Sequence, residues 1–230
     1  MLWVTKIQEA QRSILKSKMI ALFHNLGLGD HIICNGLVRE LYKIHQPLML
    51  FVLERNQVNV RHMFSDLQEL SLNVIPNDRN PYQFVEQEKM NVINVAGNAH
   101  GYGFERAFYE RAGIDYSKKW DSFKIPRNMD VEIELFKKLS LKEGEYSFIH
   151  EWGNKKIKNV PNMVNVRPLK ELGPFFDFGY TIENAVEIHC MESSFKNLVE
   201  FLNLKTDLLF FHVNGRTASR SESKLGWTEI

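Results

Sequence analysis

"FHNLGLGDHIICNGLVREL" (residues 23–41) decides how this chain begins to fold. An apolar strand over residues 19–25 runs into two closely spaced glycines and an aspartate, and an amphipathic helix is expected from Ile32 onward. Glycines let a backbone turn sharply, and the first amides of a helix point outward as unpaired donors. We therefore expect a strand-to-helix turn at the carboxyl end of a strand, where α/β sheets bind ligands.

Strand-like and helix-like segments alternate through the rest of the chain. Seven further apolar runs have strand length and end in polar or turn residues. They are residues 48–54, 72–76, 91–97, 146–152, 162–168, 186–190 and 207–213. Helical spacing lies between them at Ile33, Leu37, Leu41 and Ile44, at Ile133, Phe136 and Leu139, and at Phe195, Leu198, Val199 and Leu202. Nearly all-apolar strands in this alternation predict doubly wound α/β sheets with parallel strands.

The strands divide into two groups of about four, before Gly113 and after Gly144. Residues 115–130 between the groups have few regular apolar positions. We expect two Rossmann-like domains, residues 1–127 and residues 128–230, that face each other across a cleft.

Composition and charge exclude several classes of protein. The 230 residues are 44% hydrophobic and 25% charged, which indicates a folded globular chain. The formal charge of +1 gives no global field that would draw the chain onto nucleic acid. Charged residues interrupt the N-terminal apolar positions, so we expect no transmembrane segment and a cytoplasmic protein. Cys34 and Cys190 lie far apart, which predicts reduced thiols.

Asp30 allows two interpretations. As a helix N-cap it would accept hydrogen bonds from the amides of the next turn. As a functional residue its carboxylate would accept a proton from a hydroxyl nucleophile. His31 adds a second polar group at the same edge, and Asn25 precedes the turn.

The same turn only partly matches a dinucleotide-binding fingerprint. Gly27 and Gly29 supply G-x-G, but Ile32 stands where the third glycine belongs, and Asp30 would repel a pyrophosphate. Glu54, at the end of the next strand, is the one feature that fits. The pattern disfavours NAD.

A second candidate site lies in "TIENAVEIHCMESSFKNLVEFLN" (residues 181–203). We expect a short helix from Thr181, a strand over residues 186–190, and a helix after Glu192 with Phe195 turned inward. Ser193 and Ser194 at the start of that helix suit either ordinary capping or a phosphate ligand, and spacing alone does not separate the two.

Together, "NLGLGD" (residues 25–30) and "VEIHCMESSFKNLVEFL" (residues 186–202) resemble glycosyltransferases of the GT-B fold, especially the heptosyltransferase-like group. In that group an early G-L-G-D turn faces the acceptor, and its aspartate is the usual candidate for general base. The later motif, an apolar strand followed by D-S-G or a variant, holds the diphosphate of a nucleotide-sugar donor. Here Glu192 replaces the aspartate, "KNLVEF" replaces the usual H-L-A, and the chain is about a third shorter than a typical member.

The resemblance assigns a role to each matching residue. Asp30 is the candidate base, and Asn25, Gly27, Gly29 and His31 form the acceptor-side loop. Glu192, Ser193 and Ser194 bind the donor. Cations in the loop after residue 150 (Lys155, Lys156 and Lys158) and Arg167 after the next strand are candidates for pairing with phosphate. His150 and His189 are candidates for contacts with ribose, phosphate or sugar, and Trp152 lies in the same loop.

No metal site is expected. His24, His150, His189 and His212 lie near the ends of four separate strands, without zincin spacing or a CxxC pair. We therefore expect a metal-independent glycosyltransferase without a cofactor, acting on a nucleotide-sugar donor and a glycan or lipid-linked acceptor. The alternatives are a non-catalytic nucleotide or nucleotide-sugar binding protein of the same fold, and an enzyme that isomerises a sugar nucleotide or releases its phosphate.

Overall fold

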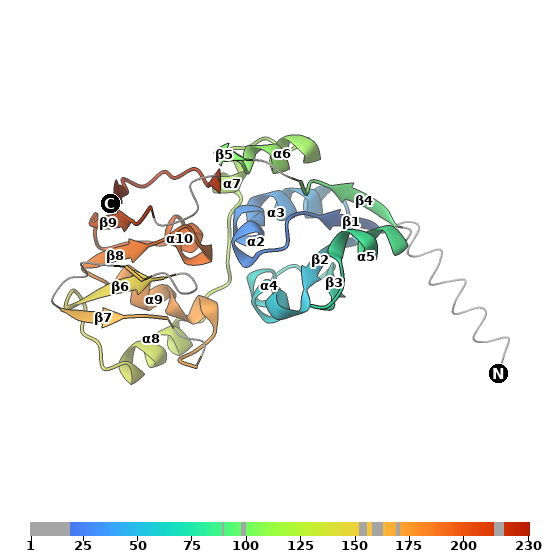
Figure 1. Ribbon diagram of the computed structural model, residues 1–230. Helices are drawn as coiled ribbons and strands as arrows, with labels where there is room; N and C mark the ends of the chain where they lie inside the picture. Colours follow the sequence, from blue (N-terminus) through green and yellow to red (C-terminus); the bar gives the residue numbers. More distant parts are fainter. Residues whose placement is uncertain are drawn as a thin grey trace, which may run out of the picture. The chain divides into compact units, whose positions relative to one another are not determined.

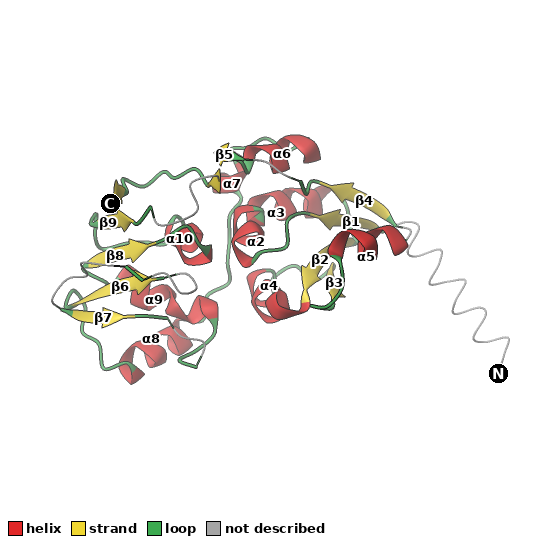
Figure 2. Cartoon of the chain, in the orientation of Figure 1, coloured by secondary structure: helices red, strands yellow, loops and turns green. Residues whose placement is uncertain are grey.

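The computed structural model describes residues 19–88, 90–97, 100–151, 156–157, 163–168, 171–213 and 219–230. Its contacts divide the chain into two compact units. The first ends at Gly97 and adds Ala107–Lys124, and the second takes Asn98–Arg106 and Ile125–Ile230. Figures 1 and 2 show strands and helices alternating in both units. Whether residues 1–127 and 128–230 act as acceptor and donor domains stays a prediction.

The first unit contains a sheet of four parallel strands in the order β3-β2-β1-β4. Its strands are β1 (Ile20–Phe23), β2 (Leu48–Leu53), β3 (Leu70–Ile75) and β4 (Asn91–Asn94). Its helices are α2 (Leu28–Ile33), α3 (Asn35–Ile44), η1 (Glu54–Asn56), α4 (Gln57–Met63), α5 (Pro81–Gln87), α6 (Arg106–Ala112) and α7 (Lys118–Asp121). Ala21, Phe23 and Phe51 of the two central strands are buried in one apolar cluster.

A break between α2 and α3 is held by one tyrosine. The buried Tyr109 hydroxyl donates to the Ile33 carbonyl at 2.9 Å and accepts from the Leu37 amide at 3.2 Å, so it replaces helix bonds lost at the break. Gly36 is required there because a Cβ would lie 1.9 Å from the Lys118 carbonyl oxygen. The expected apolar face is confirmed at Leu37 but ends before Ile44, which is 63% exposed.

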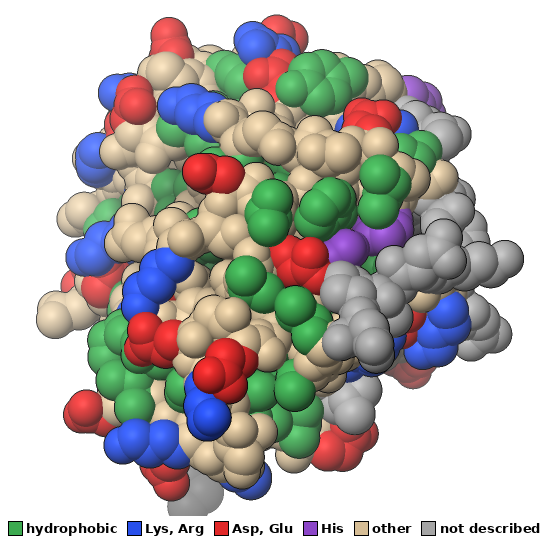
Figure 3. Space-filling model, turned by 90° about the vertical axis from the view of Figure 1, so that its left-hand side faces the viewer, with side chains coloured by type: hydrophobic (Ala, Val, Ile, Leu, Met, Phe, Trp, Pro, Cys, Tyr) green, Lys and Arg blue, Asp and Glu red, His purple; other side chains and the backbone are tan. Residues whose placement is uncertain are grey.

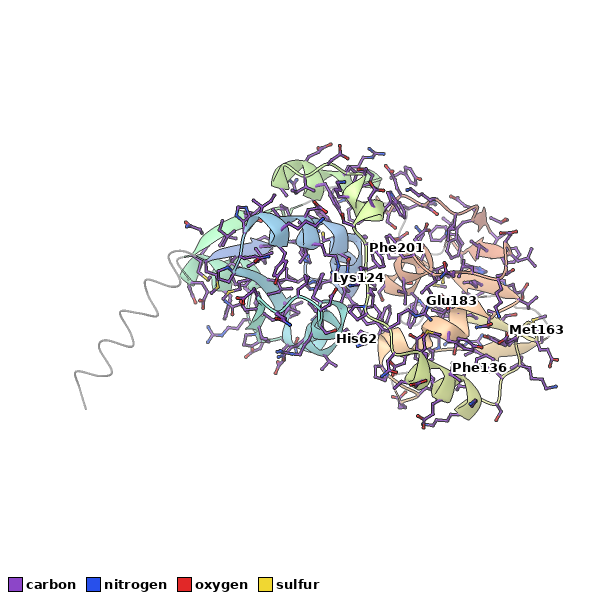
Figure 4. All side chains as sticks on the ribbon, turned by 180° about the vertical axis from the view of Figure 1, so that it is seen from behind. His62, Lys124, Phe136, Met163, Glu183 and Phe201 are labelled. Atoms are coloured by element: carbon purple, nitrogen blue, oxygen red, sulfur yellow. The ribbon has the colours of Figure 1, made fainter. Side chains whose placement is uncertain are left out.

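The second unit contains five parallel strands in the order β11-β9-β8-β6-β7. Its strands are β6 (Tyr146–His150), β7 (Val164–Val166), β8 (Glu187–Cys190), β9 (Leu209–Phe211) and β11 (Thr228–Glu229). Its helices are α8 (Met129–Lys138), η2 (Phe175–Phe178), α9 (Gly179–Glu183) and α10 (Ser194–Val199). Phe136 of α8, labelled in Figure 4, packs edge-to-face against Tyr180.

Ion pairs connect two helices of the second unit, α8 and α9. Arg127 donates to Glu132 of α8 at 2.9 Å and to Glu183 of α9 at 2.6 Å. These two carboxylates raise the pKa of the guanidinium above its ordinary value. Arg127, near the start of this unit, therefore connects α8 and α9.

The C-terminal tail contributes two short strands that the apolar pattern did not predict. β10 (Ser219–Arg220) pairs with β5 (Gly101–Tyr102), and β11 extends the five-stranded sheet at β9. Because β5 belongs to the second unit, the tail pairs within that unit at both places.

The expectation of two Rossmann-like parallel sheets is confirmed. All eight predicted strands occur, as β1–β4 and β6–β9. Both strand orders are those of doubly wound folds, in which the chain reverses direction across the sheet once. That reversal lies between β1 and β4 in the first sheet and between β6 and β8 in the second.

Candidate functional site

The first reversal point places the G-L-G-D turn where doubly wound sheets bind ligands. The Val95 amide donates to the Phe23 carbonyl at 2.8 Å, and the Asn25 side-chain oxygen accepts from the Gly97 amide at 3.2 Å. Gly97 has a φ of +149°, a conformation that side chains with a Cβ rarely adopt. The loops after β1 and β4 are thus joined beside the turn.

Helix α2 starts earlier than the sequence predicted. It begins at Leu28 rather than Ile32, and Gly27 is its N-cap with no side-chain bond. Asp30 lies in the first turn, so its interpretation as the N-cap is wrong. A Cβ on Gly27 would lie 2.6 Å from Asp30 Oδ2, which shows that the carboxylate folds back over the turn.

His31 is not at an exposed edge. Its side chain is fully buried beside the equally buried His24, with ring centroids 4.4 Å apart. Burial lowers the pKa of His24 to about 4 and holds the pKa of His31 well below its ordinary value. His31 therefore packs beneath the turn rather than at an exposed edge, and its place in the acceptor-side loop stays a prediction.

The second reversal point brings together the ends of β6 and β8. His150 pairs with Cys190, and the Met191 amide donates to the His150 carbonyl at 3.3 Å. Glu151 follows one strand, and Glu192 and Ser193 follow the other. The predicted donor motif therefore occupies the ligand-binding edge of its sheet.

The serine motif begins a helix, as expected. Ser193 is the N-cap of α10 and accepts from the Lys196 amide at 3.3 Å, while Ser194 is the first helical residue. Phe195 is buried, as expected, with its ring 5.6 Å from that of Phe148. The cap bond satisfies one amide, and α10 is only six residues long.

Glu192 is a mostly enclosed carboxylate. Burial raises its pKa, against the opposing effects of Lys196 and Ser221. Its Oε1 atom lies 3.4 Å from the Ser221 hydroxyl, which belongs to the C-terminal tail. The acid of the predicted motif therefore faces the tail.

Two predicted phosphate-binding cations contact a carboxylate of the same unit. Lys156 Nζ and Arg167 Nε lie 2.9 and 3.3 Å from Glu151 Oε2, and the Ile157 amide donates to Glu151 Oε1 at 2.9 Å. Burial alone would raise the pKa of Glu151, but these donors lower it. The structure brings Lys156 and Arg167 together through an acid that sequence reasoning missed.

The two predicted donor-side histidines lie in different surroundings. His150 packs against Phe195 with ring centroids 4.7 Å apart, and burial lowers its pKa to about 4. His189 stacks on Phe210, and its Nδ1 lies 2.9 Å from His212 Nε2. His150 is thus at the ligand-binding edge, and His189 belongs to a histidine pair.

Lys196 and Glu200 were also missed. Lys196 Nζ donates to the Ser221 hydroxyl at 3.0 Å and lies 3.7 Å from Glu200 Oε1. Glu200 also accepts from Ser223 and Trp227. The helical spacing of Lys196 and Glu200 was visible in the sequence, but nothing local showed that the tail would bury them.

Within the described ranges, no three His, Cys, Asp or Glu side chains group closely enough to hold a metal ion. Trp152, Lys155 and Lys158 lie outside the residues that the structure describes.

None of the described helices has both the length and the apolar character needed to span a bilayer.

Comparison with known proteins finds a likeness in fold. No protein-family model matches the chain, and no curated protein matches its sequence. Among solved structures, the glycosyl transferase family 9 protein from Veillonella parvula DSM 2008 is similar with a TM-score of 0.57 and 8% identity. The alignment covers 92% of this chain and 85% of that chain. At this identity the likeness supports the motif-based resemblance at the level of the fold.

Proposed function

We propose that the chain is a glycosyltransferase that moves a sugar from a nucleotide-sugar donor to a hydroxyl acceptor. The observation that carries the proposal is the position of the two motifs. Residues 25–30 follow β1 at the reversal point of the first sheet, and residues 192–194 follow β8 at that of the second. Two separate motifs thus occur at the places where doubly wound sheets bind ligands. The fold likeness to a glycosyl transferase family 9 protein supports the same function.

In the proposed reaction, Asp30 removes the proton of the acceptor hydroxyl. The hydroxyl oxygen bonds to the anomeric carbon as the bond from that carbon to the diphosphate breaks. The carboxylate lies over Gly27, where the lack of a Cβ leaves space for it. A general base of this kind contributes about 10²–10⁴-fold to rate.

On the donor side, we assign the diphosphate to Ser193, Ser194 and the neighbouring amides, with His150 beside them. Arg167 and Lys156 contact the diphosphate only if they exchange their contacts with Glu151 for contacts with the phosphate oxygens. Independence from metal and cofactors, and a glycan or lipid-linked acceptor, are parts of the same proposal.

The experiment is a thermal-shift screen with ADP, GDP, UDP, CDP and their sugar conjugates, followed by an assay of nucleoside diphosphate release. Ligand at about 100 times its Kd stabilises a fold by about 2.7 kcal/mol. We expect one nucleotide to shift the transition, and Asp30→Asn to abolish transfer while the shift remains. Glu69→Gln is the control, because Glu69 is an exposed carboxylate that precedes β3, at the amino edge of the same parallel sheet. Full transfer activity in Asp30→Asn would refute the assignment of the base.

The Glu151 contacts favour one second candidate, a non-catalytic nucleotide-binding protein. Two cations near the donor motif already pair with a carboxylate, which leaves less positive charge to stabilise a departing diphosphate. A nucleotide-dependent shift without turnover on any acceptor would support this candidate.

A further inference from the structure

One face of the second sheet carries a chain of polar side chains. Tyr146 and Phe148 of β6 point toward the helices, since they contact Phe136 of α8 and Phe195 of α10. Successive side chains on a strand alternate between faces, so Ser147 lies on the opposite face. Glu187 of β8 is on that face too, because Ser147 Oγ donates to Glu187 Oε1 at 2.7 Å.

His189 and His212 continue the chain. His189, two residues after Glu187 on the same face, has its Nε2 atom 3.4 Å from Glu187 Oε1, an electrostatic contact in which the buried Nε2 atom has no hydrogen-bond partner. Its other nitrogen, Nδ1, lies 2.9 Å from His212 Nε2. His212 follows β9, and its amide donates to the Cys190 carbonyl at the carboxyl edge of the sheet. Figure 3 shows histidine side chains beside acidic and apolar ones on one side of the molecule, and His189 and His212 are both mostly buried.

The contacts determine where the protons lie. A neutral imidazole has one N–H and one lone pair. The carboxylate of Glu187 favours the proton of His189 on Nε2, so Nδ1 of that ring must accept. The hydrogen of the 2.9 Å contact then belongs to His212 Nε2. This leaves the lone pair of His212 on Nδ1, in a residue that is 4% exposed at the carboxyl edge of the sheet.

We propose that Glu187, His189 and His212 form a proton relay in which His212 Nδ1 is the base for a hydroxyl group of a ligand at the carboxyl edge of the second sheet. The hydroxyl O–H bond breaks, an N–H bond forms on His212, and the electron pair stays on oxygen. The positive charge is shared through His189 and offset by Glu187. A base oriented by a second residue and a carboxylate follows the logic of catalytic triads. The inference does not depend on the proposed role of Asp30, which is in the other unit.

The surrounding charges are consistent with a neutral base. Burial lowers the pKa values of both histidines; His189 lowers the pKa of His212 further, while Glu187 partly opposes the shift at His189. Glu187 is the charged group that faces the pair from β8. Arg220, paired with Glu229 of β11, lies over the ring of Phe211, whose side chain points to the opposite face from His212. His212 is thus free to accept a proton at neutral pH.

The first test is long-range ¹H–¹⁵N NMR of the histidine side chains in the full chain at pH 7. We expect both rings to be neutral with the proton on Nε2. A proton on Nδ1 of His212 would overturn the relay. This measurement needs no variant and no substrate.

The second test is the rate at which diethylpyrocarbonate acylates His212, since only an unprotonated imidazole reacts. His212 is already unprotonated at pH 7, so the rate depends on the nucleophilicity of its ring; in Glu187→Gln, loss of the carboxylate makes the ring a weaker nucleophile, and the rate falls about threefold. Glu229→Gln is the matched control because it removes the same charge from a carboxylate that faces Arg220 instead. Equal rates in Glu187→Gln and the wild type would overturn the positioning role of Glu187.

The ligand class is tested with ribose and methyl glucoside at millimolar concentration. A hydroxyl that donates to His212 Nδ1 moves its ¹⁵N resonance, and His212→Gln serves to assign that signal. No movement with either sugar would overturn the assignment of a hydroxyl ligand. Full transfer activity in Asp30→Asn, or no thermal shift with any nucleotide, would overturn the proposed function but leave these three measurements unchanged, so the two proposals fail separately.

Discussion

The carboxyl edges of the two sheets are held by different kinds of contact. In the first, neutral groups hold the G-L-G-D turn, including Asn25 and an Asn56 side chain that donates to the Leu26 carbonyl at 2.8 Å. In the second, charged groups lie near the serine motif, and Lys156, Arg167 and Lys196 each contact a carboxylate of the same unit. Backbone conformation therefore stabilises the edge of the first sheet, and buried charge stabilises the edge of the second. We expect the first to be sensitive to substitutions of glycine and the second to substitutions of charged residues.

The largest expected effect tests the charged edge. Lys196→Met keeps the length of the side chain but leaves Glu200, whose side chain is 2% exposed, without its cation. Removing one partner of a buried pair costs about 3–5 kcal/mol in the free energy of unfolding. Urea unfolding measures it.

Two further variants test whether burial of the Lys196–Glu200 pair explains the loss of stability in Lys196→Met. Lys205→Ala breaks an exposed ion pair with Glu143 and should leave the urea midpoint unchanged. Adding Glu200→Gln to Lys196→Met should recover part of the loss, because it removes the unpaired charge. An unchanged urea midpoint in Lys196→Met would mean that the Lys196–Glu200 pair does not stabilise the packing of the C-terminal tail.

The second effect tests the edge built from backbone shape. Gly97→Ala places a Cβ at a φ of +149° and 3.0 Å from Arg111 Nη1, so we expect about 2 kcal/mol of destabilisation. Gly226→Ala is the control, since a Cβ there meets open space at an ordinary φ. Equal unfolding midpoints for Gly97→Ala and Gly226→Ala would show that backbone conformation at Gly97 does not stabilise the edge of the first sheet.

The strands of both edges could be predicted because buried parallel strands are continuous apolar runs. The start of α2 could not, because "LGLGD" reads as a turn and no capping side chain marks Leu28. The burial of His31 could not be predicted for a related reason. A helix that starts four residues earlier turns residue 31 toward the core.

The remaining errors involve contacts distant in sequence. Glu151 pairs with Arg167 sixteen residues away, and β10 pairs with β5 across more than a hundred residues. A two-residue strand has no periodicity, so only the folded chain shows its partner. Motif positions were therefore predictable, but the charges around them were not.

The third effect tests histidine burial at each edge. His24 and His150 both have a pKa of about 4, below the value near 6.5 of an unfolded chain. The unfolded state thus binds more protons, and stability present above pH 6.5 is lost as pH falls toward 4. Each histidine accounts for about 2 kcal/mol between pH 7 and pH 5.

His150→Phe keeps the aromatic contact with Phe195 and removes the titrating group. Hydrogen exchange at pH 7 and pH 5 should then show less acid destabilisation of the second unit than in the wild type, with His189 and His212 accounting for the remainder, and no change in the first unit. An acid destabilisation of the second unit equal to that of the wild type would show that other groups control its acid stability.

The smallest effect separates capping from ligand binding, the question that spacing left open at Ser193. Ser193 caps α10 and Asn80 caps α5, where Asn80 accepts from the Tyr82 and Gln83 amides. Replacing either by alanine costs about 1 kcal/mol in the free energy of unfolding, which urea titration measures. If Ser193 also binds a diphosphate, only Ser193→Ala weakens the thermal shift produced by the nucleoside diphosphate. Equal shifts in the two variants would reduce Ser193 to a cap and move the donor site away from the helix that follows β8.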